Sequence, residues 1–127
     1  MADQAHFPKC AKLLKPAEYK HVFNAANRIS DRHLTIFYCA NDLNQPRLGL
    51  AISKKVSKLA VDRNRIKRLA RETFRLKQFT LQSADFVVLA RPSAVKIENK
   101  VLIASFNKLW NKLKLAAEKS EPDQNKS

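Results

Sequence analysis

The sequence of 127 residues contains a single glycine, Gly49, so a glycine-rich loop that could cradle phosphates is excluded. No apolar run approaches the roughly 18 residues needed to cross a membrane. The first ten residues, MADQAHFPKC, lack the basic and then apolar pattern of an export signal. These absences predict a cytoplasmic protein without a membrane-spanning segment.

Cysteine, histidine and acidic residues are also scarce. The two cysteines, Cys10 and Cys39, have no Cys or His nearby at metal-ligand spacing, which predicts two free thiols. His6, His21 and His33 are scattered, with no plausible nucleophile or carboxylate partner in the sequence. The 11 acidic residues are too dispersed to hold the paired ions of a two-metal nuclease. We therefore predict no catalytic residue and no metal site in the protein itself.

Positive charge, in contrast, is abundant. Lys and Arg number 25 against 11 Asp and Glu, which gives a formal net charge of +14. Solubility alone does not require such an excess, so the expected partner is a polyanion: nucleic acid or an anionic membrane surface. The chain can bury one real core but is too short for two ordinary domains.

Periodicity and turn residues divide the chain into elements. Pro16 is well placed to begin a short helix over residues 16–26, because its fixed φ suits the first helical turn. Three alternating or apolar segments predict strands at 33–40, 47–53 and 85–92, and the first two are expected to pair as an antiparallel hairpin. A second long helix is predicted over residues 98–117.

The expected domain spans residues 7–117. Residues 1–6 are predicted to form a flexible N-terminus. Residues 118–127 are polar and contain Pro122, which predicts a disordered tail.

The stretch SKKVSKLAVDRNRIKRLARETFR, residues 53–75, holds nine Lys or Arg opposed only by Asp62 and Glu72. At about 100° per residue it forms an amphipathic helix that begins between Ser57 and Asp62. The face predicted to be buried consists of Ile66, Leu69, Ala70, Thr73, Phe74 and Leu76. Around the opposite arc lie Lys67, Arg71, Asn64, Arg75, Arg68, Glu72 and Arg65, while the direction of Arg63 stays open.

The exposed face of this helix is almost entirely positive, and this decides how we interpret it. A face that only solubilises mixes both charges, whereas this one brings like charges together, which costs a few tenths of a kcal/mol per pair. Arginine predominates from residue 63 onward, and its planar fork suits phosphate or a guanine edge. A membrane helix would carry many large apolar residues opposite the charges and would not usually lie between two strands. We therefore expect a nucleic-acid partner and no membrane.

The segment RLGLAISKKVSKLAVDRNRIKRLARETFR, residues 47–75, closely resembles the signature of the bacterial ribonuclease P protein component. In that family a Gly-containing strand and a Lys-Lys pair lead into a helix with Arg-Asn-Arg, Ile-Lys-Arg and Arg-Glu-x-Phe. The resemblance covers roughly residues 7–115, including the aromatic helix, an aromatic strand and DFVVLARP before the final helix.

The resemblance implies an α+β fold. Family members form a single α-β-β-β-α-β-α sandwich, ribosomal protein S5 domain 2-like, with the arginine-rich helix packed on a mixed four-stranded sheet. The sequence pattern locates only three strands. We expect the remaining one to arise from a split within the regions 33–40 and 47–53 or from a short extra pairing.

The resemblance also implies a function. The protein would be the non-catalytic subunit of an endoribonuclease whose RNA subunit carries the catalytic site, uses Mg²⁺ and removes the 5′ leader of precursor tRNA. One protein per RNA is expected. The residues implied to bind the catalytic RNA are Arg63, Asn64, Arg65, Lys67, Arg68, Arg71 and Arg75. Those implied to bind the single-stranded leader are Tyr19, Phe23, Phe37, Lys54 and Lys55.

Some alternatives stay open. Phe23 is almost as well explained as a core residue, because Val22 and Ala26 continue its apolar stripe. Relatives often carry Phe and Tyr where this chain has Tyr19 and Phe37, so stacking should persist while a hydrogen bond from residue 37 is impossible. A ribosomal or RNA-chaperone protein would also explain the charge. A DNA-binding regulator fits less well, since the basic helix follows a strand rather than another helix.

Overall fold

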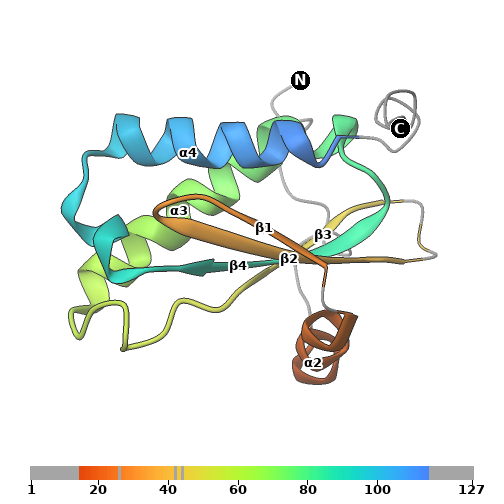
Figure 1. Cartoon of the computed structure of the whole chain (residues 1–127), viewed down its shortest axis with the longest axis horizontal. Coiled ribbons are helices and arrows are strands. Elements are labelled where there is room, and N and C mark those ends of the chain that lie inside the picture. The colour runs from red at the N-terminus through yellow and green to blue at the C-terminus, as the bar shows by residue number, and fades with distance from the viewer. Residues whose placement is uncertain (1–14, 26, 42, 44, 115–127) are drawn as a thin grey trace.

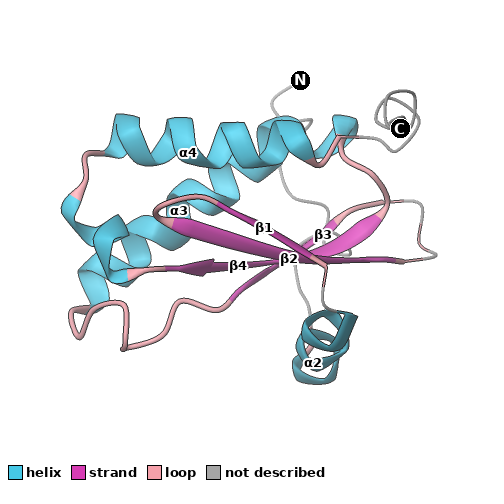
Figure 2. Cartoon of the chain, in the orientation of Figure 1, coloured by secondary structure: helices cyan, strands magenta, loops and turns pink. Residues whose placement is uncertain are grey.

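The structure is a computed structural model that describes residues 15–25, 27–41, 43 and 45–114. The predicted flexible N-terminus at 1–6 and disordered tail at 118–127, like Cys10 and His6, lie outside the described residues. Within the described part, α-helices and one sheet form a single small α+β domain, as expected (Figures 1 and 2). The elements are α2 (Pro16–Ala25), β1 (Arg28–Ser30), β2 (Leu34–Ala40), β3 (Arg47–Leu50), α3 (Ala60–Lys77), η2 (Gln78–Thr80), β4 (Ala84–Ala90), η3 (Pro92–Lys96) and α4 (Asn99–Lys112).

The sheet is mixed and has the order β1-β2-β4-β3. β4 pairs antiparallel with β2 and parallel with β3, so it lies between the two strands that we expected to form a hairpin. That hairpin prediction is wrong. Five successive side chains of β4 are buried, from Ala84 to Val88, and a strand covered on both faces gains most in the centre of a sheet.

The strand missing from the sequence pattern is β1, which pairs antiparallel with β2 through Ile29 and Ile36. It precedes the regions 33–40 and 47–53, so it does not arise from a split within them; it is a short extra pairing, the other possibility that we expected. At three residues it is too short to show an alternating pattern. The segment 47–53 also forms a shorter strand than predicted, because β3 ends at Leu50.

One face of the sheet carries α3 and α4, and the main core lies between these two layers (Figure 1). Its centre is an aromatic cluster in which the Trp110 ring lies 5.5 Å from Phe74 and 5.7 Å from Phe86, between ring centroids. The indole nitrogen of Trp110 donates a hydrogen bond of 2.9 Å to the Thr73 hydroxyl. Buried Trp usually needs such a partner, which explains a polar residue on the buried face of α3.

Among the residues that the structure describes, α2 alone covers the opposite face of the sheet, and it covers only part of it (Figure 1). Val22 of α2 and Val87 of β4 are fully buried between them and form a second, smaller apolar cluster. The sheet therefore separates two surfaces of the described part: α3 with α4 lie on one side, and α2 lies on the other.

The two long helices differ slightly from the prediction. α3 begins at Ala60, inside the expected range, and buries every residue of the predicted face except Leu76, whose surface is 70% exposed. That part of the prediction is wrong, because Leu76 lies at the edge of the apolar arc, where α4 does not cover it. α4 ends at Lys112 rather than near 117, since Lys114 already pairs with Leu81 in an isolated β-bridge.

Candidate nucleic-acid interface

The exposed face of α3 carries cations that nothing in the described part of the protein neutralises. Arg68 and Arg71 are exposed, and within that part of the chain neither side chain has a hydrogen-bond or ion-pair partner. The same holds for the side chains of exposed Asn64 and of half-buried Lys67 and Arg75. These five residues, the basic face of α3, are free to bind an anion.

Arg63 belongs to the same motif but is directed into the protein. One nitrogen of its guanidinium donates to the carbonyls of Ser57, at 2.9 Å, and Lys58, at 3.0 Å. These bonds hold the loop that leads into α3, whose first residues have no side-chain cap from Leu59. The direction of Arg63, which the helical wheel left open, is therefore toward its own N-terminal loop.

Arg65 is also occupied by the protein. Its guanidinium donates to the Asn99 side chain at 2.7 Å and to the carbonyls of Ala94, at 3.3 Å, and Val95, at 3.1 Å. It thus ties α3 to η3 and to the first turn of α4. The Arg65 guanidinium still contributes positive charge here, but both of its terminal nitrogens already donate hydrogen bonds within the protein.

On the other face of the sheet, the three predicted aromatic residues come together. Phe23 of α2 and Phe37 of β2 meet edge to face, with ring centroids 5.1 Å apart. The Tyr19 hydroxyl accepts a bond of 3.0 Å from the Leu50 amide, which anchors α2 to the end of β3. All three rings are half-buried. We call these three residues the aromatic cleft, a name that refers to the leader-binding role implied for them by the family resemblance.

Cations border this cleft. The guanidinium carbon of Arg28 lies 5.8 Å from the centre of the Phe37 ring, a cation–π arrangement. Lys54 and Lys55 are exposed in the turn that follows β3. Ala51 packs against the apolar cluster of Val22 and Val87 and precedes Lys54 by three residues, so Lys54 lies within roughly 10 Å of Ala51. Sequence reasoning missed Arg28, whose position beside Phe37 depends on the pairing of β1.

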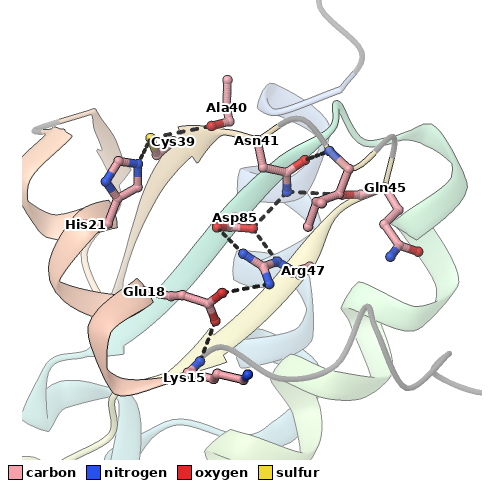
Figure 3. Close-up of polar contacts among 10 residues, drawn as sticks. Lys15, Glu18, His21, Cys39, Ala40, Asn41, Gln45, Arg47 and Asp85 are labelled. Carbon is pink, nitrogen blue, oxygen red and sulfur yellow. Dashed lines mark hydrogen bonds and ion pairs between the residues drawn. The ribbon is translucent and has the colours of Figure 1, made fainter.

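A buried ion pair fixes the N-terminal end of α2 to the sheet (Figure 3). Arg47 of β3 binds Asp85 of β4 through two bonds of 2.8 Å and reaches Glu18 of α2 at 3.0 Å. Asn41 donates a further bond of 2.8 Å to Asp85. The hydrogen bonds that Arg47 donates to Asp85 and Glu18 outweigh burial and raise the pKa of Arg47 above its usual value. We call Arg47, Asp85 and Glu18 the ionic clamp.

The charge of Glu18 is likewise stabilised. The Lys15 amide donates to its carboxylate at 2.6 Å, and this bond, with the Arg47 guanidinium, holds the pKa of Glu18 below its usual value. Glu18 therefore stays ionised at neutral pH. The aromatic cleft thus has one wall, α2, that is anchored at Tyr19 and again at Glu18.

A second carboxylate shapes the turn between β1 and β2. Asp31 accepts bonds from the amides of His33, at 2.9 Å, and Leu34, at 3.0 Å, and from the Ser105 hydroxyl of α4. Burial opposes ionisation, but these bonds and nearby Lys108 prevail and lower the pKa of Asp31. A pocket of about 420 Å³ borders this turn. The Asp31 carboxylate already accepts hydrogen bonds from these three groups, so we assign it the role of fixing the turn between β1 and β2.

Two histidines have partners that the sequence did not reveal. The His21 Nε2 atom lies 3.4 Å from the Cys39 sulfur, and His33 Nδ1 lies 2.9 Å from the Ser93 hydroxyl. Cys39 is a free thiol, as predicted. Among the described residues, neither histidine ring has a carboxylate partner, and no three His, Cys, Asp or Glu side chains converge to hold a metal ion.

Comparison with known proteins decides the family. The ribonuclease P family model matches residues 7–114. The chain is 50% identical over 107 residues to the ribonuclease P protein component of Photobacterium profundum, covering 84% of this chain and 91% of the relative. The chain belongs to the ribonuclease P protein family. A second relative, from Methylococcus capsulatus, is 48% identical over 104 residues, covering 82% of this chain and 81% of the relative.

Solved ribonuclease P proteins share the fold. The Staphylococcus aureus RNase P protein superposes with a TM-score of 0.75 at 26% identity, covering 80% of this chain and 94% of that one. The resemblance found in the sequence is thereby confirmed, as is the four-stranded mixed sheet with its packed helices. Membership decides against the ribosomal or RNA-chaperone alternative.

As a protein component of ribonuclease P, the chain takes part in the 5′ maturation of tRNA together with an RNA subunit. Within the described residues, no helix of this ribonuclease P protein is both long and apolar enough to cross a membrane. The structure brings Tyr19, Phe23 and Phe37 together and leaves Arg68 and Arg71 without partners among the residues it describes, while Arg63 and Arg65 contact their own chain. Which RNA each of these residues binds stays a prediction.

Proposed function

We propose that the two surfaces of this protein bind two different RNAs. The basic face of α3 binds the catalytic RNA, and the aromatic cleft binds the single-stranded 5′ leader of precursor tRNA. The observation that carries this division is that α3 and α2 lie on opposite faces of one sheet (Figure 1). α3 carries arginines without a partner among the described residues, and α2 carries two of the three half-buried rings. Guanidinium forks suit the backbone of folded RNA, while flat rings suit unstacked bases.

Within the cleft, Phe37 is the main candidate for stacking. Its ring meets Phe23 edge to face, and Arg28 lies near the Phe37 ring, where it would place a cation next to a leader phosphate. Tyr19 has a different role, because its hydroxyl already accepts a hydrogen bond from the Leu50 amide. This bond fixes the orientation of the Tyr19 ring, so the hydroxyl is not assigned to a nucleotide. Lys54 and Lys55 would neutralise leader phosphates beyond the rings.

The chemistry belongs to the RNA in this proposal. The RNA subunit supplies the catalytic site and binds the Mg²⁺ ions, and the protein supplies positive charge and substrate binding. One protein would bind each RNA in the cytoplasm, where precursor tRNA is processed. The net charge of +14 supports this role, because a basic protein can replace some of the divalent ions that hold anionic RNA together.

The division of chemistry predicts how cleavage responds to the protein. At a Mg²⁺ concentration too low for the RNA alone, adding this protein should restore cleavage of precursor tRNA at the mature 5′ end. The measurement is single-turnover cleavage across a Mg²⁺ titration, with and without protein. A control containing protein purified free of RNA should show no cleavage, and cleavage in that control would refute a non-catalytic role.

The cleft is tested by Phe37→Ala. We expect the preference for precursor tRNA over mature tRNA to fall by about 1–3 kcal/mol, the contribution of one base stacked on one ring. Binding to the catalytic RNA should stay nearly unchanged. The measurement is equilibrium binding of the catalytic RNA, and of both tRNAs to the assembled complex.

Two matched variants separate stacking from packing. Phe37→Leu keeps an apolar contact with Phe23 but removes the aromatic face, so it should lose most of the preference, whereas Phe37→Tyr should retain it. Thermal unfolding must first show that each variant folds, since loss of a fully buried Phe costs about 3–5 kcal/mol of stability. If the three binding reactions weaken equally in a folded Phe37→Ala protein, Phe37 does not bind the leader.

A further inference from the structure

An apolar pair of side chains marks the C-terminal end of α3. Leu76 is 70% exposed and Phe79, in η2, is 74% exposed, although Gln78 between them is only 4% exposed. The Gln78 side-chain amide donates to the Arg75 carbonyl at 3.0 Å, so a polar side chain lies inside and an aromatic one outside. Single exposed apolar residues are ordinary, but two large ones in adjacent turns form a patch. We call it the Leu76–Phe79 patch.

The patch continues the basic face of α3. Phe79 lies in η2, the turn that directly follows the last residue of α3, and it comes four residues after Arg75. Lys77 turns away, since its ammonium group donates to the Asn111 side chain of α4 at 3.1 Å. An apolar surface therefore adjoins a row of arginines without partners in the described part of the chain.

We propose that the Leu76–Phe79 patch receives an unstacked base of the catalytic RNA while Arg71 and Arg75 bind the adjoining phosphates. The inference rests on the proposed function, in which α3 binds that RNA. A nucleotide has one flat apolar part and one anionic part, and this end of α3 offers one surface for each.

A second copy of the chain fits the patch less well. Stable protein interfaces bury about 800 Å² on each partner, far more than two side chains provide. The surrounding arginines would also meet the same positive charges on the other copy, with +14 on each. Charge complementarity therefore favours RNA as the occupant.

The test uses the full chain and the ribonuclease P RNA of the same organism. Phe79→Ala should weaken equilibrium binding by about 10- to 100-fold, as expected for one stacked base. Phe79→Trp should bind as well as the original protein or better. The control is Val101→Ala on α4, another exposed apolar side chain, which should change nothing. Because Phe79 is so exposed, all variants should unfold at the same temperature.

Two further readouts identify stacking as the cause. Phe79→Ala removes no charge, so the slope of log affinity against log salt should match the original protein, whereas arginine variants should reduce it. The emission of Phe79→Trp should be quenched when RNA is added. The original protein provides the control, because Trp110 is fully buried and should not report on RNA.

The outcomes separate this inference from the role of α3. If Phe79→Ala binds the catalytic RNA like the original protein while the double variant Arg68→Ala, Arg71→Ala binds it weakly, then α3 binds the RNA but no base stacks on the patch. If neither variant changes binding, the role of α3 fails as well. Sedimentation that shows a dimer dissociated by Phe79→Ala would mean that the patch is a protein contact, and would overturn the proposal.

Discussion

Replacing Arg68 and Arg71 together with alanine should weaken binding of the catalytic RNA by about 3 kcal/mol or more. Each arginine can form charge-assisted hydrogen bonds with phosphate worth roughly 1.5–3 kcal/mol. Both side chains are exposed and have no partner among the described residues, so their loss should leave folding intact. The measurement is equilibrium binding between about 50 and 200 mM salt, where the slope should become shallower.

Arg65→Ala is the matched contrast on the same helix. It removes the bonds to Asn99 and to the carbonyls of Ala94 and Val95, so its main effect should be a lower free energy of unfolding. Urea unfolding of the original protein, Arg65→Ala and the double variant distinguishes a role in stability from a role in RNA binding. A stable Arg65→Ala protein that binds RNA as weakly as the double variant would show that Arg65 contacts RNA.

The ionic clamp predicts the second large effect, on stability. Asp85 is only 4% exposed and neutralises Arg47 through two hydrogen bonds of 2.8 Å. Asp85→Ala should lower the free energy of unfolding by about 3–5 kcal/mol, because it leaves a buried guanidinium with only Glu18 as a charged partner among the described residues. For a small domain that is roughly a third or more of its total stability. Urea unfolding at neutral pH gives the value.

Two controls show whether the uncompensated charge is the cause. Glu18→Ala removes the more exposed partner of Arg47 and should cost about 1 kcal/mol or less. Combining Asp85→Leu with Arg47→Met removes both charges and should recover much of the lost stability. A double variant no more stable than Asp85→Ala would mean that packing, rather than charge, holds this end of α2.

Sequence periodicity predicted the parts of the fold that depend on local pattern. The apolar face of α3 follows from the helical repeat, so Ile66 and Phe74 could be placed in the core without tertiary information. The roles of Arg63 and Arg65 could not. The hydrogen-bond partners of a long arginine side chain depend on which carbonyls the fold brings near it. Ala94, whose carbonyl Arg65 binds, lies 29 residues away in the sequence.

The pairing of strands was beyond the sequence for a similar reason. Alternation shows that a strand has a buried face, but it does not show which strand lies beside it, and β4 took the place beside β3 that we had given to β2. The aromatic cleft was anticipated through the family resemblance, and the meeting of Phe23 with Phe37 confirms that these residues converge. The proximity of His21 to Cys39 had no signal, since it depends on how α2 crosses β2.

The central position of β4 also bears on how the chain folds as it is synthesised. β2 and β3 share no edge with each other, and both pair with a strand that begins only at Ala84. Until that segment has left the ribosome, the earlier strands cannot form most of the sheet. During this time α3, with its like charges, has no complete sheet to pack against. Contacts distant in sequence must therefore form late, which slows folding compared with a helical domain of equal length. During the interval before β4 appears, the polyanions of the ribosome surround the nascent basic helix.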